Sequence, residues 1–218
     1  VSSLIAGVSQ QGFAEYETQC ALEYLLSRPE VDPRRIGMTG ASGGGYNTWI
    51  TASLDDRIRV AVPVVGTSQF ALQISFARER DWYNAAEHCH FVPGLITFAD
   101  NHELLAMAAP RPLLVINSAT DPGFVAGNLI DYGRNLYAAH GMPERFGYFN
   151  DPSSGHGYQQ RKREAAYGWF LRYLMDRGDG SPSPEGPVDI APPDAAELRC
   201  FPEGKRAAGP GMEEFVRK

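Results

Sequence analysis

The stretch Arg35-Ile36-Gly37-Met38-Thr39-Gly40-Ala41-Ser42-Gly43-Gly44-Gly45 decides the fold. Its first half predicts a short strand, and residues 46–54 predict a helix that follows the glycines closely. Ser42 therefore lies in a Gly-x-Ser-x-Gly pattern between a strand and a helix, where a sharp turn projects the hydroxyl clear of the sheet. We expect side chains at Gly40 and Gly44 to collide, because the strand and helix backbones approach each other there.

The context of Ser42 predicts a nucleophile. The five-residue pattern alone is common, so the alternative interpretation is that Ser42 is an incidental serine in a glycine-rich connection. The flanking strand and helix favour the nucleophile. The first N–H groups and the dipole of the following helix suit an anion, such as the oxyanion of an acyl-transfer intermediate.

Apolar strand-like segments alternate with helix-like segments along the chain. This alternation predicts an α/β fold with a mainly parallel sheet, whose functional groups gather at the carboxyl ends of the strands. The predicted strands are 35–39, 59–65, 111–117 and 145–149, and the predicted helices are 13–27, 46–54, 103–109, 125–140 and 160–177. Residues 66–101 form a long, aromatic-rich excursion between the second and third strands.

A serine hydroxyl needs a neighbouring base, and the base needs a carboxylate that fixes its tautomer. His156 is the predicted base, because it follows the fourth strand in a loop with a glycine on either side. Asp121, which follows the third strand directly, is the predicted acid. Asp151 is the rival, although it shares a loop with His156 and could serve only to cap a turn. The order Ser, Asp, His after successive strands favours Ser42, Asp121 and His156.

Two further groups of residues invite a functional interpretation. His88, Cys89 and His90 alternate as metal ligands could, but no second ligand cluster accompanies them. A loop at the mouth of a pocket is the favoured interpretation, so neither a metal nor a cofactor is predicted. Tyr46 lies close to Ser42 and is a candidate for shaping an acyl pocket, with core packing as the alternative.

Composition and charge narrow the function classes. The chain has 218 residues, 43% of them hydrophobic, which is enough for one α/β domain with a sizeable core. The formal net charge is −6 and no basic tract is present, so a nucleic-acid partner is not expected. No apolar run approaches the length of a membrane span. Three cysteines are too few for a disulfide framework and leave the compartment open.

With these residues in hand, the chain resembles α/β-hydrolases of the acetyl xylan esterase and dienelactone hydrolase-like kind. The resemblance rests on SRPEVDPRRIGMTGASGGG before and through Ser42, AAPRPLLVINSATDPGF around Asp121 and GHGY around His156. It covers roughly residues 15–175. It implies a Ser42 nucleophile, an Asp121 acid, a His156 base and an oxyanion donor at the Gly43 N–H group.

The resemblance also implies an activity and leaves alternatives open. It implies a serine esterase that cleaves acetyl or other short-chain esters through an acyl-enzyme. Acylated carbohydrate is one substrate class that it suggests, and a secreted or periplasmic location is one that it allows. A prolyl-oligopeptidase-type peptidase shares the fold and the order of the triad. A non-catalytic hydrolase-like binding module is the alternative from a different class.

The resemblance sets the expected organisation as well. We assign 1–177 to the C-terminal portion of a hydrolase domain, 178–194 to a Pro/Gly/Ser-rich linker and 195–218 to a tail or the beginning of a further segment. Such folds have strands before the nucleophile strand, yet the 34 residues before Arg35 contain no convincing one. Because an isolated half-sheet would expose an apolar edge, we expect an N-terminal segment or a partner chain to complete the sheet.

Overall fold

The computed structural model describes residues 7–72, 92–121, 126–188, 190–192, 195–199 and 201. In these ranges a four-stranded parallel sheet has the order β1-β2-β3-β4, which confirms the predicted α/β class. The strands are β1 (Gly37–Ala41), β2 (Val60–Val64), β3 (Leu113–Ser118) and β4 (Phe146–Asp151). The helices are α2 (Gln10–Leu26), α3 (Gly43–Leu54), α5 (Leu105–Ala108), α6 (Leu129–Ala139) and α7 (Gln160–Met175). Short 3-10 turns span Leu95–Thr97, Pro143–Arg145 and Ala196–Leu198.

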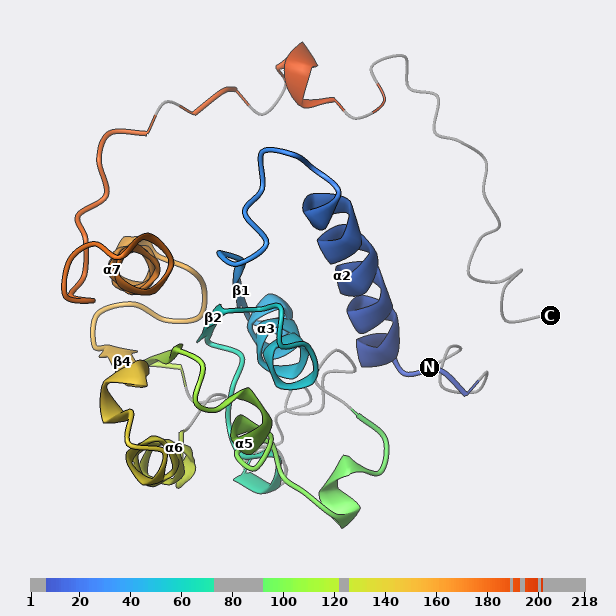
Figure 1. Ribbon diagram of the computed structural model, residues 1–218, viewed down its shortest axis with the longest axis vertical. Coiled ribbons are helices and arrows are strands. Elements are labelled where there is room, and N and C mark those ends of the chain that lie inside the picture. The colour runs from blue at the N-terminus through green and yellow to red at the C-terminus, as the bar shows by residue number, and fades with distance from the viewer. Residues whose placement is uncertain are drawn as a thin grey trace.

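The central strands are buried on both faces, as their continuous apolar runs predict. Side chains alternate between the faces, so Leu113 and Val115 of β3 pack in the core with α3 and α6, whereas Leu114 and Ile116 pack towards α7. Figure 1 shows α7 on one side of the sheet and α3 on the other, with α2 beyond α3. The sheet is therefore covered by helices on both faces.

The strand β1 lies at the edge of the described sheet. Its register with β2 runs from Gly37 opposite Val60 to Ala41 opposite Val64. Gly37 and Thr39 are exposed, whereas every residue of β2 is buried. Because all four strands are parallel, their carboxyl ends meet at one edge of the sheet, and β1 ends there next to Ser42.

Several element boundaries differ from the predicted ones. The helix expected from residue 13 begins at Gln10, because the Ser9 hydroxyl accepts a hydrogen bond of 2.9 Å from Gly12 N–H and caps it. The helix expected from residue 46 begins at Gly43, immediately after the serine. The strand expected at 35–39 lies at 37–41, since its pairing with β2 continues to Ala41. None of the helices in the described ranges is long and apolar enough to cross a membrane.

Part of the predicted linker lies against α7. Ser183 N–H donates to the Glu164 carbonyl at 2.9 Å, and Arg163 makes a two-pronged ion pair with Glu185 at 2.8 and 2.9 Å. The linker composition of this segment therefore does not prevent local packing. The domain boundaries given above stay predictions.

Candidate active site

The backbone of Ser42 is held in a strained conformation. Its φ of 60° and ψ of −122° lie in a region that residues other than glycine rarely occupy unless the surrounding structure imposes it. The imposing contacts are a hydrogen bond of 2.9 Å from Ser42 N–H to the Val64 carbonyl and one of 3.0 Å from Tyr46 N–H to the Ser42 carbonyl. A serine that precedes a helix usually caps it with its hydroxyl. Ser42 makes no such capping bond, so the helix does not use its hydroxyl.

The glycines around Ser42 permit this turn, but not all for the expected reason. A Cβ at Gly40 would lie 2.5 Å from the Gly44 carbonyl oxygen, which confirms the steric prediction there. At Gly44 the prediction is wrong, because a Cβ would meet nothing within 4 Å. The crowded glycines are instead Gly45, where a Cβ would collide with the last carbonyl oxygen of β2, and Gly66, where a Cβ would collide with the carbonyl oxygen of Ser42.

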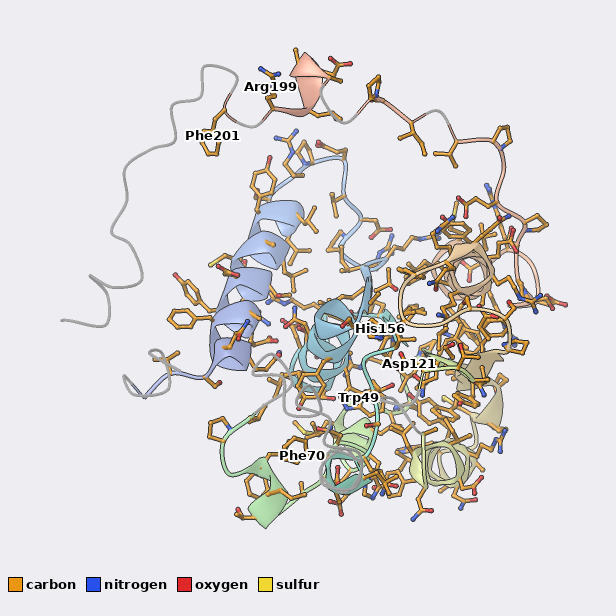
Figure 2. The ribbon with its side chains drawn as sticks, turned by 180° about the vertical axis from the view of Figure 1, so that it is seen from behind. Trp49, Phe70, Asp121, His156, Arg199 and Phe201 are labelled. Carbon is orange, nitrogen blue, oxygen red and sulfur yellow. The ribbon has the colours of Figure 1, made fainter. Side chains whose placement is uncertain are left out.

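Asp121 and His156 are in direct contact. The His156 Nδ1 atom lies 2.7 Å from Asp121 Oδ2, and Figure 2 shows the two residues side by side. The Asp121 side chain is 4% exposed and the His156 side chain 47%. A carboxylate on Nδ1 favours the tautomer with its proton on that nitrogen, which leaves the lone pair on Nε2. The pair therefore has the geometry of a general base with its orienting acid.

Asp151, the rival acid, has other partners. Its carboxylate is fully buried and accepts hydrogen bonds from the N–H and hydroxyl of Ser153, at 3.0 and 2.8 Å, and from the Ser154 hydroxyl. Burial alone would raise the pKa of Asp151, but these hydrogen bonds and the positive charge of Lys162 outweigh it and lower the pKa. Asp151 thus shapes the loop that carries His156, and Asp121 contacts the imidazole.

Ser42, Asp121 and His156 lie at the same edge of the sheet because each follows the end of a parallel strand: β1, β3 and β4 respectively. Backbone strain gathers at this edge too, since Val65, just past β2, has a φ of 38° and is fully buried. Strained residues cluster at functional sites. The catalytic roles of the three residues stay predictions.

Tyr46 is 1% exposed, and its hydroxyl donates a 3.0 Å hydrogen bond to Asn101 Oδ1. Burial raises the pKa of Tyr46. Trp49 Nε1–H donates to the Asn101 carbonyl at 3.0 Å, so both aromatic residues hold the segment at Asn101 against α3. This geometry is that of packing residues, and a Tyr46 contact with substrate stays a prediction.

Two other predictions concern backbone and metal sites. Gly43 is the first residue of α3, where an N–H group has no partner within the helix, and its role as an oxyanion donor stays a prediction. His88, Cys89 and His90 lie outside the described residues. Within the described ranges, no group of three His, Cys, Asp or Glu side chains is placed to hold a metal ion.

Lys162 is not among the site residues predicted from the sequence. This lysine is fully buried on α7, and its ammonium group donates hydrogen bonds to carbonyl oxygens of the His156 loop. A signal for it exists in the sequence: Lys162 precedes the buried residues Ala165, Ala166 and Trp169 by three, four and seven positions, so it lies on the apolar face of that helix.

A parallel sheet in which a strand runs directly into a strained serine at the start of a helix is the arrangement of the α/β-hydrolase fold. Solved structures with this fold superpose on the chain. The glucuronoyl esterase from Sporotrichum thermophile does so with a TM-score of 0.65 and 18% sequence identity, over 90% of this chain and 59% of that one. The expected α/β-hydrolase fold is thereby confirmed.

The chain belongs to the prolyl oligopeptidase family, whose model matches residues 9–177, and this match confirms the expected α/β-hydrolase superfamily. The protein YtaP of Bacillus subtilis is 34% identical over 120 residues, which make up 54% of this chain and 38% of YtaP. The 4-O-methyl-glucuronoyl methylesterase of Neurospora crassa is 25% identical over 183 residues, or 74% of this chain and 46% of the esterase. The chain thus spans less than half the length of these relatives.

Proposed function

We propose that the protein is a serine hydrolase that cleaves carboxylic esters. Ser42 attacks the ester carbonyl while His156 Nε2 takes its proton, and Asp121 orients and stabilises the imidazolium. The Gly43 N–H group donates to the oxyanion. His156 then protonates the departing alcohol, and water, activated by the same base, releases the acid from the acyl-enzyme. The observation that carries the proposal is the Asp121–His156 hydrogen bond at the strand edge where the strained Ser42 lies.

The proposed substrate is an ester on a carbohydrate. The relatives named glucuronoyl methylesterases support a methyl ester of a uronic acid, in which the sugar supplies the acyl group. An acetylated sugar, in which the sugar supplies the alcohol, is the second candidate and follows from the resemblance to acetyl xylan esterases. The two differ in the part of the substrate that the acyl pocket must accept.

The second oxyanion donor in this proposal comes from a strand and loop that pair with the open edge of β1. In the described part of the chain β1 pairs only with β2, and an unpaired edge invites another strand. We assign that strand to an N-terminal segment or to a partner chain. Gel electrophoresis and intact mass of the native protein test this assignment, and a single stable species of 23.9 kDa that turns over esters would contradict it.

Hydrolysis of p-nitrophenyl acetate and of methyl glucuronate, by the wild type and by Ser42→Ala, tests the activity. A fluorophosphonate probe read by mass spectrometry reports on the nucleophile. We expect turnover and a single label on Ser42, both lost in Ser42→Ala, with methyl glucuronate the better substrate. Turnover that survives in Ser42→Ala would refute the mechanism. A clear preference for the acetyl ester would move the substrate assignment to acetylated sugars.

A peptidase of the prolyl oligopeptidase type is the second candidate, favoured by the family match over residues 9–177. A proline-containing peptide p-nitroanilide, assayed beside the two esters, separates the peptidase from the esterase. A non-catalytic binding module would hydrolyse none of them and would take up no fluorophosphonate.

A further inference from the structure

Lys162 is buried without a carboxylate partner close by. Its side chain has no exposed surface, and in the described part of the chain no carboxylate oxygen lies within 4.0 Å of its Nζ atom. Burial lowers the pKa of Lys162, while the charges of Asp151 and Asp121 act in the opposite direction. A buried ammonium group costs several kcal/mol unless its donors are satisfied, so what satisfies them indicates what the lysine does.

All three donors of Lys162 are used, and they converge on the His156 loop. Nζ donates to the Gly155 carbonyl at 2.6 Å and to the Gly157 carbonyl at 3.0 Å, which are the residues on either side of His156. The third bond, of 2.9 Å, goes to Gln159 Oε1, and the Nε2 group of Gln159 donates to the His156 carbonyl at 3.1 Å. Three successive carbonyl groups are thus held by one lysine and the glutamine bound to it.

The loop needs these hydrogen bonds because its backbone is otherwise weakly restrained. Gly155 and Gly157 give the segment wide backbone freedom, and Gly157 has a φ of 131°, a conformation that side-chain-bearing residues rarely adopt. The imidazole of His156 is about half exposed, so packing alone does not hold it. The bond to Asp121 restrains the ring through Nδ1, but the position of the ring also depends on the backbone from which it projects.

Other side chains hold the earlier part of the loop. The hydroxyls of Ser118 and Thr120 both donate to the Ser154 carbonyl, and Asp151 accepts from Ser153 N–H. These contacts stop before Gly155. Lys162 therefore restrains the stretch of the loop that carries the base itself.

We propose that Lys162 is a positioning residue for His156: its ammonium group clamps the Gly155 and Gly157 carbonyls and so places the imidazole at the distance from Ser42 that proton transfer requires. The proposal rests on the proposed serine-hydrolase function. It assigns no direct contact between Lys162 and substrate. Displacement of a catalytic group by about 1 Å can cost 100-fold in rate, so a clamp of this kind affects kcat.

The test uses Lys162→Met, which keeps the length and apolar stem of the side chain but removes the ammonium group. Leu22→Ala is the control for lost stability, because Leu22 is buried on α2 and packs in the core on the α3 side of the sheet. Both variants are assayed in the intact protein at a temperature at which circular dichroism shows each to be folded. We expect kcat for the ester to fall roughly 10- to 100-fold in Lys162→Met with KM within about twofold, and neither to change in Leu22→Ala.

Gln159→Leu is the second variant, because Gln159 is only partly buried and its loss should not prevent folding. We expect a smaller loss of kcat in the same direction. The His156 carbonyl loses its donor and Lys162 loses one of its three acceptors, but Lys162 still donates to the Gly155 and Gly157 carbonyls. Equal kcat in Lys162→Met and Leu22→Ala would overturn the proposal. So would an effect confined to KM.

A readout without turnover separates this proposal from the esterase assignment. In protein labelled with ¹⁵N-histidine, the ring signals of His156 report its tautomer and mobility. We expect them to broaden or split in Lys162→Met and to stay unchanged in Leu22→Ala. If the wild type neither cleaves esters nor takes up the fluorophosphonate, the proposed function fails, and the ring signals still decide on the clamp: signals unchanged in Lys162→Met overturn it.

Discussion

Separate exchanges of Asp121 and Asp151 for asparagine should divide catalysis from stability. Asp121 Oδ2 accepts from His156 Nδ1 at 2.7 Å, and an asparagine amide can turn its N–H₂ group towards that nitrogen instead. The imidazole then carries its proton on Nε2 and cannot take the proton of Ser42. We expect kcat to fall about 10³- to 10⁴-fold in Asp121→Asn, with a loss of about 1 kcal/mol in the free energy of unfolding.

Asp151→Asn should show the opposite pattern. The buried carboxylate accepts three hydrogen bonds from Ser153 and Ser154, and the neutral amide keeps acceptor capacity on one atom only. Hydrogen bonds to a charged group contribute about 1.5–3 kcal/mol each, and one or two are weakened or lost. We therefore expect the free energy of unfolding to fall by roughly 2–4 kcal/mol, while kcat falls by less than about tenfold.

Steady-state hydrolysis of p-nitrophenyl acetate gives kcat, and urea denaturation gives the free energy of unfolding. The two variants have the same change of chemistry at two buried carboxylates, so each is the control for the other. A larger loss of kcat in Asp151→Asn than in Asp121→Asn, with stability retained, would refute the assignment of the acid.

The remaining predictions concern the serine turn and acid stability. Gly40→Ala should lower the free energy of unfolding by about 2–4 kcal/mol, because the new Cβ meets a backbone carbonyl. Gly44→Ala should leave the free energy of unfolding unchanged or raise it by up to about 1 kcal/mol. Equal urea midpoints for the two variants would contradict this prediction. Arg57 donates to both carboxylate oxygens of Asp55 and lowers its pKa to about 2. Asp55 therefore binds its proton more tightly in the unfolded chain than in the folded one. The ion pair contributes on the order of 2 kcal/mol to the free energy of unfolding above about pH 4, and this contribution is lost as the pH falls towards 2. Between pH 5 and pH 2 the urea midpoint should fall less steeply with pH in Asp55→Asn than in the wild type. An equally steep fall in both proteins would contradict the stabilising role of the ion pair.

Much of the fold could be predicted because its signals are local. The apolar run of β2 and the Gly-x-Ser-x-Gly turn each depend on neighbours in sequence, and parallel strands bring Ser42, Asp121 and His156 to one edge by topology alone. The same reasoning named Asp121 ahead of Asp151, although both follow an apolar strand. For the candidate site, the sequence was therefore sufficient to name Ser42, Asp121 and His156, but not Lys162.

Tertiary contacts decided what remained. Whether Gly44 or Gly45 is the crowded glycine depends on how the first turn of α3 meets β2, a contact that no local pattern encodes. The pairing of Asp121 with His156, and of Asp151 with Ser153 and Ser154, became visible only once both strands and the loop had positions. Lys162 lies on the apolar face of α7 by its spacing, but its partners are backbone carbonyls, which every residue has and which the sequence cannot distinguish. By itself the sequence determined which functional residue follows each strand, in the order Ser42, Asp121 and His156. The packing of α7 against the sheet decided which side chain holds the His156 loop in place.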